Sequence, residues 1–200
     1  MRQPKSKEKI RKDQILEVAA RLFRKKGFSA TSVRMIASEM NMEAASLYNH
    51  ISSKQDILKE LLLTLAREFM EGMEQVEKSG LNPFQKLEML VSLHVKLTLA
   101  HPDQISLITG EWVHLEEPML SQYVAHRSDY EKRFKSIISD GMKEGYIEKT
   151  DVDMAVYSIL SSLHWLYSWS GRHRDLAAEE IEKEIKQCLL YGLKKRESFS

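Results

Sequence analysis

The stretch from Thr31 to Lys54 reads TSVRMIASEMNMEAASLYNHISSK and predicts a short helix, a tight turn and a second short helix. In its first part, apolar residues recur at i, i+3, i+4 and i+7, the spacing of one buried helix face; they are Val33, Ile36, Ala37 and Met40. Thr31 or Ser32 precedes this stripe and supplies a hydroxyl of the kind that caps helix starts. Asn41 follows it and tolerates the left-handed conformation of a sharp turn.

The second helix is expected from about Glu43 to Ile51, with Leu47 and Ile51 as its inward residues. A helix of this length is not stable alone in water, so it must rest on neighbouring elements. Its outer face is small, polar or aromatic with a hydroxyl, which suits a DNA groove; it comprises Ala44, Ala45, Ser46, Tyr48, Asn49 and His50. We therefore predict a helix-turn-helix over about residues 32–51.

Residues 27–58, GFSATSVRMIASEMNMEAASLYNHISSKQDIL, resemble the DNA-binding domain of the TetR family of bacterial transcriptional regulators. The matching features are Gly27-Phe28, Thr31-Ser32-Val33-Arg34, Ile36-Ala37, Leu47-Tyr48-Asn49-His50 and Ser53-Lys54. Asn41 stands where the family usually has Gly, and Ala45 stands where Gly or Pro is common. The resemblance implies an all-α fold with a three-helix DNA-binding domain at residues 1–52. A larger helical domain for effector binding and dimerisation is expected at residues 53–200.

The rest of the chain is also helix-periodic, and most of the eight Gly and four Pro of the sequence stand where helices are expected to end or begin. We find no strand alternation and no internal repeat. The expected helices are about 7–26, 53–76, one from Pro83, one from Pro102, one after Pro118 reaching Met142, one capped by Asp151, and about 178–195.

The net charge of +1 conceals an asymmetry. Residues 1–56 contain twelve Lys/Arg and six Asp/Glu, whereas residues 57–200 contain eighteen and twenty-three. The positive end is expected to meet the nucleic acid. Its basic run fits either an arm along phosphates or in a minor groove, or a solvated tail; the run consists of Arg2, Lys5, Lys7, Lys9, Arg11 and Lys12.

Cys188 is the single cysteine of the sequence, which excludes an intrachain disulfide and a secreted disulfide scaffold. The first dozen residues are basic without a following apolar core, unlike a signal peptide, and no apolar run approaches the length of a membrane span. We expect a cytoplasmic protein.

The roles of individual residues on DNA follow from their chemistry, with the family's pattern as a guide. Arg34 could fork onto a guanine edge or a phosphate, Ala44 and Ala45 offer methyl groups to thymine, and Asn49 could meet a base or a phosphate. Phosphate contacts are expected from Ser32, Ser46, Tyr48, His50 and Lys54. Tyr48 could equally be a packing residue with its hydroxyl at the rim.

The last two expected helices have wide aliphatic stripes, and Gly192 in a helix interior would cost about 1 kcal/mol against Ala. Such a glycine suggests a close approach of helices, as in a four-helix dimer interface; the alternative is that these helices complete the core of one chain. One recognition helix covers few base pairs, so we expect a homodimer on a near-palindromic double-stranded operator. The predicted interface residues are Ile159, Leu163, Ile181, Ile185, Leu189, Gly192 and Leu193.

Residues 84–170 are rich in Met and aromatic side chains. In the TetR family such helices enclose a cavity for a small molecule, so the resemblance implies a lipophilic effector; the alternative is a dry core. The predicted lining residues are Met89, Trp112, Tyr123, Tyr130, Phe134, Trp165 and Trp169. The segment from His164 loosely resembles regulators that sense acyl-coenzyme A thioesters, which implies that Arg172, His173 and Arg174 meet phosphates; a solvated basic loop is the alternative.

The sequence is compatible with two other functions. A constitutive DNA-binding protein would need no effector. A di-iron enzyme is suggested by the Glu111-x-x-His114 spacing, but such a site needs two of these pairs and the chain has one. We therefore expect no enzyme activity, no metal and no cofactor, and a repressor that leaves its operator when the effector binds, as the family tends to do.

Overall fold

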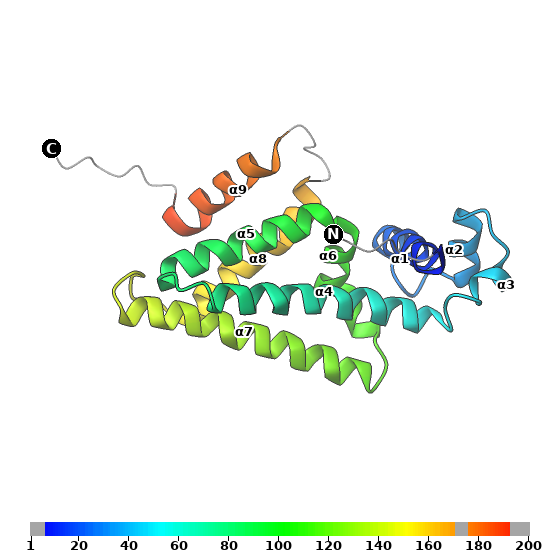
Figure 1. Ribbon diagram of the computed structural model, residues 1–200, viewed down its shortest axis with the longest axis horizontal. Helices are drawn as coiled ribbons and strands as arrows, with labels where there is room; N and C mark the ends of the chain where they lie inside the picture. Colours follow the sequence, from blue (N-terminus) through cyan, green and yellow to red (C-terminus); the bar gives the residue numbers. More distant parts are fainter. Residues whose placement is uncertain (1–6, 171–175, 193–200) are drawn as a thin grey trace. The chain divides into compact units, whose positions relative to one another are not determined.

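The computed structural model describes residues 7–170 and 176–192, and in this part of the chain all regular structure is helical (Figure 1). The predicted all-α fold is confirmed. The helices are α1 (Lys7–Lys26), α2 (Val33–Glu39), α3 (Ala44–Leu47), α4 (Lys54–Glu77), α5 (Pro83–Ala100), α6 (Pro102–Gly110), the 3-10 helix η1 (Glu111–His114), α7 (Met119–Lys143), α8 (Val152–Ser170), α9 (Ala178–Lys186) and the π-helical turn η2 (Gln187–Tyr191).

Helix starts follow the residues that the sequence singled out. Ser53 precedes α4, and its hydroxyl accepts from the N–H of Asp56 at 3.0 Å. Pro83 and Pro102 open α5 and α6, where a missing N–H costs nothing. The carboxylate of Asp151 accepts from the N–H of Met154 at 2.9 Å and caps α8.

By packing, the described chain divides elsewhere than at the predicted boundary after residue 52. A first unit contains residues 7–68 and 101–128, and a second unit contains residues 69–100, 129–170 and 176–192. The first unit therefore includes α6, η1 and the beginnings of α4 and α7. The reason is that α6 packs on α1, and Leu107 and Leu115 join the core beneath the helix-turn-helix.

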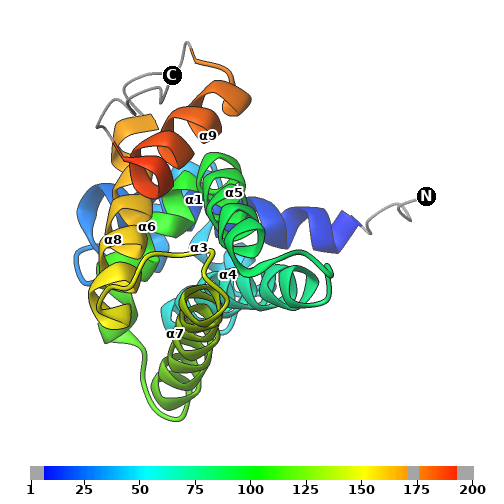
Figure 2. The same ribbon diagram turned by 90° about the vertical axis from the view of Figure 1, so that its left-hand side faces the viewer.

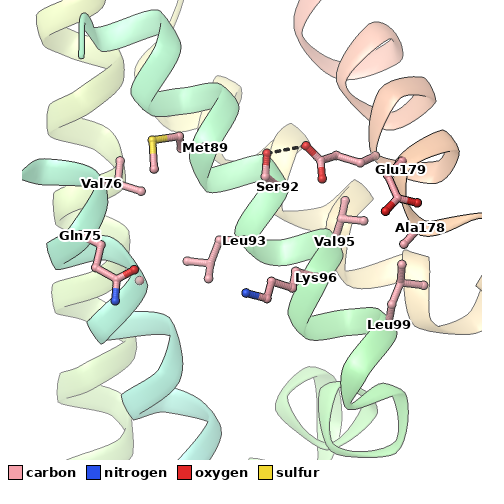
Figure 3. Close-up of a pocket in the computed structure, with 12 residues that line it drawn as sticks. Gln75, Val76, Met89, Ser92, Leu93, Val95, Lys96, Leu99, Ala178 and Glu179 are labelled. Carbon is pink, nitrogen blue, oxygen red and sulfur yellow. Dashed lines mark hydrogen bonds between the residues drawn. The ribbon is translucent and has the colours of Figure 1, made fainter. Parts of the chain in front are cut away.

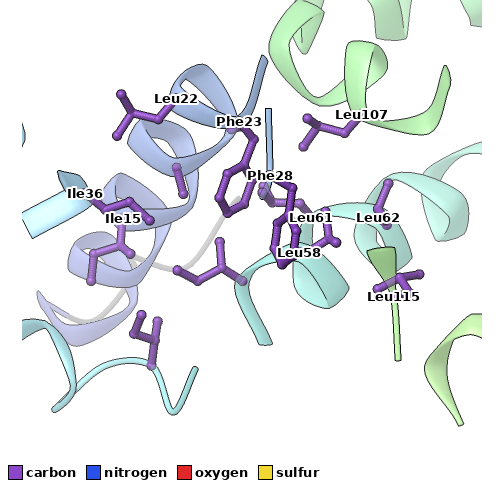
Figure 4. Close-up of a cluster of buried hydrophobic side chains, with 14 of the residues drawn as sticks. Ile15, Leu22, Phe23, Phe28, Ile36, Leu58, Leu61, Leu62, Leu107 and Leu115 are labelled. Atoms are coloured by element: carbon purple, nitrogen blue, oxygen red, sulfur yellow. The ribbon is translucent and has the colours of Figure 1, made fainter. Parts of the chain in front are cut away.

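The core of the first unit is one apolar cluster (Figure 4). Ile15 and Phe23 of α1 are fully buried there, together with Ile36 of α2 and Leu58 of α4. Because α2 and α3 have seven and four residues, their position depends on this cluster rather than on their own hydrogen bonds.

In the second unit, α5 contacts both α8 and α9 (Figures 1 and 2). Its buried face is apolar except for His94 and Thr98. None of the helices in the described residues is long and apolar enough to cross a membrane.

Candidate nucleic-acid interface

The first half of the helix-turn-helix has the predicted geometry. Ser32 is the N-cap of α2, and its hydroxyl oxygen accepts from the N–H of Met35 at 3.2 Å. Ile36 and Ala37 are buried. Asn41 has a φ of 52°, the left-handed conformation expected of it, so the chain turns sharply before the next helix.

The second helix is shorter than predicted. Regular α-helix covers Ala44–Leu47 instead of reaching Ile51. After Leu47 the N–H groups of Asn49 and His50 bond to the carbonyls of Ser46 and Leu47, three residues back, which tightens the last turn. Leu47 and Ile51 are both buried, as the spacing predicted, so this segment still rests on the core.

The outward residues of this segment form the candidate interface. Ala45, Ser46 and Asn49 are exposed, and Tyr48 is 54% exposed, which favours an outward role over packing. Ser32 and Arg34 of the preceding helix are also exposed. Ala44 is half-buried and packs partly against the core, which leaves less of its methyl group for a thymine.

His50 is half-buried, and its Nδ1 atom is buried without a hydrogen-bond partner. A proton on Nδ1 would be a buried donor lacking an acceptor, which is costly. Of the two ring nitrogens, Nε2 is therefore the one suited to carry an N–H, which is a donor of the kind that binds a phosphate oxygen.

Lys54 has partners that sequence reasoning missed. Its Nζ donates to the carbonyl oxygens of Phe28 at 2.8 Å and Thr31 at 2.9 Å, and it lies 4.2 Å from the centroid of the Phe28 ring. An ammonium has three donors. One N–H therefore remains for a phosphate, and the other two hold the loop before α2.

Ion pairs decide which cations of the first unit are available to DNA. Arg21 pairs with Glu39 and Arg24 pairs with Asp103, each at 2.9 Å. Among the described residues, Arg34, Lys25 and Lys26 are exposed and make no ion pair. The two lysines were not among the predicted DNA contacts. The Lys-Lys pair directly before Gly27 is the sequence feature that could have indicated them.

The predicted effector-lining residues belong to both units of the chain. Trp112 and Tyr123 belong to the first unit, where their rings stack with centroids 6.1 Å apart, and burial raises the pKa of Tyr123 to about 12. Tyr130 and Phe134 are buried in the second unit, and both rings pack against His94.

The two predicted effector-lining tryptophans of α8 lie on an exposed face. Trp165 is 72% exposed and Trp169 is 38% exposed. Neither side chain is enclosed by the single chain. Tyr157 and Met154, which are 71% and 62% exposed, share this face of the helix.

The second unit contains an apolar groove of about 400 Å³ between α4, α5 and the start of α9 (Figure 3). Met89 is the predicted effector-lining residue that lies in it. Lys96 and Glu179 are exposed among its lining, and Ser92 donates to the carboxylate of Glu182 at 2.8 Å. The other lining residues are Gly72, Gln75, Val76, Leu93, Val95, Leu99 and Ala178.

Several predicted interface residues belong instead to the core of the single chain. Ile159, Leu163 and Ile181 are buried there, since α8 and α9 turn these side chains toward α5. Ile185 and Leu189 are half-buried. Leu193 lies outside the described residues, as do Arg2, Lys5, Arg172, His173 and Arg174.

Gly192 does not lie in a helix interior, which corrects the reason given for a close helix approach. It follows η2 with a φ of 79°, and a Cβ atom there would meet nothing within 4 Å. A glycine takes this conformation without steric cost, so it ends the helix.

The Glu111-x-x-His114 pair lies in η1, with Glu111 Oε2 and His114 Nε2 3.5 Å apart. No group of three or more His, Cys, Asp or Glu that could hold a metal ion occurs among the described residues. The Glu111 carboxylate instead accepts from the N–H of Phe28 at 3.0 Å.

Comparisons with known proteins agree with this geometry. Residues 80–193 match the family described as Tetracyclin repressor-like, C-terminal domain, and residues 15–61 match Bacterial regulatory proteins, tetR family. The HTH-type transcriptional repressor KstR2 of Mycobacterium tuberculosis is 26% identical over 188 residues, 92% of this chain and 94% of the relative.

Solved structures give the same result. The ketosteroid transcriptional regulator KstR2 of Mycobacterium tuberculosis has a TM-score of 0.86 at 26% identity, with 97% of this chain and 98% of that chain covered. AibR in complex with isovaleryl coenzyme A and operator DNA has a TM-score of 0.76 at 26% identity, with 90% and 97% covered. With one family match over more than half of the chain and a second over the helix-turn-helix, the chain belongs to the TetR family of bacterial transcriptional regulators.

Proposed function

We propose that this regulator is a repressor that binds a near-palindromic operator as a homodimer and leaves it when a small lipophilic effector binds. The observation that carries the proposal is the helix-turn-helix, in which Leu47 and Ile51 fix a short helix while Ser46, Tyr48 and Asn49 remain exposed. The name of KstR2 as a repressor supports the direction of regulation. Operator binding implies a cytoplasmic protein.

On the operator, different residues of the helix-turn-helix and its flanks read bases and contact phosphates. Arg34, Ala45 and Asn49 are exposed and have the groups that read base edges, with a smaller part for the half-buried Ala44. Hydroxyl, imidazole and ammonium groups contact phosphates and so position the protein without reading the sequence. They are the side-chain groups of Ser32, Ser46, Tyr48 and His50 and the third N–H of the Lys54 ammonium.

The exposed face of α8 is the surface on which we propose that two chains meet. Met154, Tyr157, Trp165 and Trp169 lie within about 120° of the helix circumference at about 100° per residue. A face of this kind marks an interaction site more often than a free surface. Ile185 and Leu189 of the last two helical segments remain candidates for the same interface.

For the effector we propose an acyl-coenzyme A thioester. The AibR complex contains such a ligand together with operator DNA, which supports this chemistry for a related fold. The groove lined by Met89 and Leu93 has the size of a small-molecule site and an apolar lining that suits an acyl chain. Lys96 at its rim, and Arg172, His173 and Arg174 in the sequence just before α9, would meet the phosphates.

The test is to select genomic DNA fragments bound by the full chain and then to challenge the complexes with acyl-coenzyme A thioesters of increasing chain length. We expect near-palindromic fragments that thioesters release and free coenzyme A does not. Leu93→Trp, which fills the groove, should abolish release, whereas Val124→Trp at an exposed valine outside the groove should not. Selection without any release would favour a constitutive DNA-binding protein.

A further inference from the structure

Two other segments hold Phe28 by its backbone. Its N–H donates to the carboxylate of Glu111 at 3.0 Å, and its carbonyl oxygen accepts from the ammonium of Lys54 at 2.8 Å. Glu111 begins η1 and Lys54 begins α4. A negative and a positive group therefore fix the two polar ends of one residue, in hydrogen bonds stronger than those between neutral groups.

The side chain of Phe28 is held by the same segments. Its ring stacks on the imidazole of His114 with centroids 5.5 Å apart and meets the Phe23 ring edge-on at 5.1 Å. Gln55 Nε2 donates to the carbonyl of His114 at 2.8 Å, which ties α4 to η1. Phe28 is thus enclosed between α1, the beginning of α4 and η1, which belong to the first unit.

The Glu111 carboxylate has few other partners. Its side chain is 24% exposed, and among the described residues the side chain beside it is the His114 imidazole, whose Nε2 lies 3.5 Å from Oε2 of Glu111. The Phe28 N–H is a donor that no helix satisfies, because Gly27 has ended α1 with a φ of 86°. Removing the carboxylate would leave this donor without a protein partner.

The position of Phe28 sets where the helix-turn-helix begins. Three residues later, the carbonyl oxygen of Thr31 accepts from the same Lys54 ammonium. The Thr31 hydroxyl donates to the Gly27 carbonyl oxygen at 2.8 Å. Ser32 then caps α2. A shift of the Phe28 backbone would displace the start of α2 and, through the Asn41 turn, α3.

We infer that Glu111 is a positioning residue for operator binding, which acts through the Phe28 N–H and touches no DNA itself. The inference rests on the proposed DNA-binding function. It gives the Glu111-x-x-His114 spacing a role that is distinct from metal binding.

The test compares Glu111→Ala, Glu111→Gln and Asp103→Ala in operator affinity, each in the full chain. Asp103→Ala is the matched control, because it removes one negative charge from the same unit by breaking the Arg24 pair without touching Phe28. We expect Glu111→Ala to weaken operator binding at least tenfold. Glu111→Gln, whose amide oxygen still accepts from the N–H, and Asp103→Ala should stay within threefold of the wild type.

Two further measurements separate positioning from a phosphate contact and from lost stability. The slope of log Kd against log salt should be the same in Glu111→Ala as in the wild type, because the change removes no cation that contacts a phosphate. Amide exchange at Phe28 should accelerate in Glu111→Ala and remain slow in Asp103→Ala. Wild-type affinity in Glu111→Ala, or an equal loss of affinity in Asp103→Ala, would overturn the inference. A wild-type chain that selects no operator would overturn both the repressor proposal and the inference that rests on it.

Discussion

The Nε2 atom of His94 and the hydroxyl oxygen of Tyr130 lie 2.9 Å apart in the buried interior of the second unit. Burial, with a smaller electrostatic contribution from the neighbouring His164, lowers the pKa of His94 to about 3. Burial also raises the pKa of Tyr130. The two groups therefore form a hydrogen bond between neutral partners at physiological pH.

This pair predicts that the protein loses stability in mild acid. In the unfolded chain His94 binds a proton near its ordinary pKa of 6.5, whereas in the folded chain it stays neutral down to about 3. The unfolded state thus binds more protons in this window, and stability falls as the pH drops from 6.5 toward 3. His94 alone should cost about 1.4 kcal/mol between about pH 7.5 and about pH 5.5.

Urea denaturation of the wild type and of His94→Gln at these two pH values measures the effect. Glutamine can still hydrogen-bond to Tyr130 but does not titrate, and the other six histidines are common to both proteins. The stability lost in acid should be smaller in His94→Gln by about 1.4 kcal/mol. Equal losses in the two proteins would show that His94 is not buried in its neutral form.

A second prediction concerns the exposed face of α8. Trp165→Glu should convert the proposed dimer into a folded monomer, because the change places a charge in the proposed interface but leaves the core of the chain intact. Operator affinity should fall as the dimer dissociates. Sedimentation at several concentrations gives the oligomeric state, and circular dichroism shows whether the chain remains helical.

Tyr146→Glu is the control for Trp165→Glu, since Tyr146 is also an exposed aromatic residue of the second unit but lies outside α8. It should leave the dimer unchanged. If Trp165→Glu remains dimeric at the same concentrations as the wild type, the α8 face is not the interface.

Much of the fold could be predicted because local chemistry determines it. A Ser before a short helix suits the N-cap, and an Asn after it suits a left-handed turn. Ser32 and Asn41 have these roles in the structure. Pro83 and Pro102 start helices because their fixed φ fits the first turn.

The assignments that failed depend on neighbours that periodicity does not identify. Helix α8 has apolar residues on two faces, and the sequence alone did not indicate that Leu163 faces the core while Trp165 faces outward. Lys54 has an ammonium that suits a phosphate and a carbonyl equally, so its contact with Phe28 required the fold. The same is true of Glu111, which is distant from Phe28 in sequence.

A third prediction tests the close approach of α4 and α5. A Cβ atom at Gly72 would lie 2.4 Å from Cδ2 of Leu93, whereas one at Gly110 would meet nothing within 4 Å. Ala gains about 1 kcal/mol over Gly in a helix, and overpacking costs about 1–3 kcal/mol. Thermal denaturation should therefore show that Gly72→Ala is neutral to destabilised and that Gly110→Ala loses no stability. A gain of stability in Gly72→Ala would mean that Leu93 moves aside without cost.

The last prediction separates the residues that hold DNA from those that read it. Tyr48→Phe removes one exposed hydroxyl from the second helical turn of the helix-turn-helix, and a neutral hydrogen bond contributes about 1 kcal/mol. Each half-site should thus lose roughly fivefold in affinity, equally for every operator variant. The salt dependence should not change, because a neutral hydroxyl releases no counterion. Arg34→Ala should instead flatten the salt dependence if the guanidinium lies on a phosphate, or relax the preference at one base pair if it forks onto a guanine. Binding measured on a set of single-base operator variants at several salt concentrations distinguishes these outcomes. A base-selective loss in Tyr48→Phe would contradict the phosphate role of its hydroxyl.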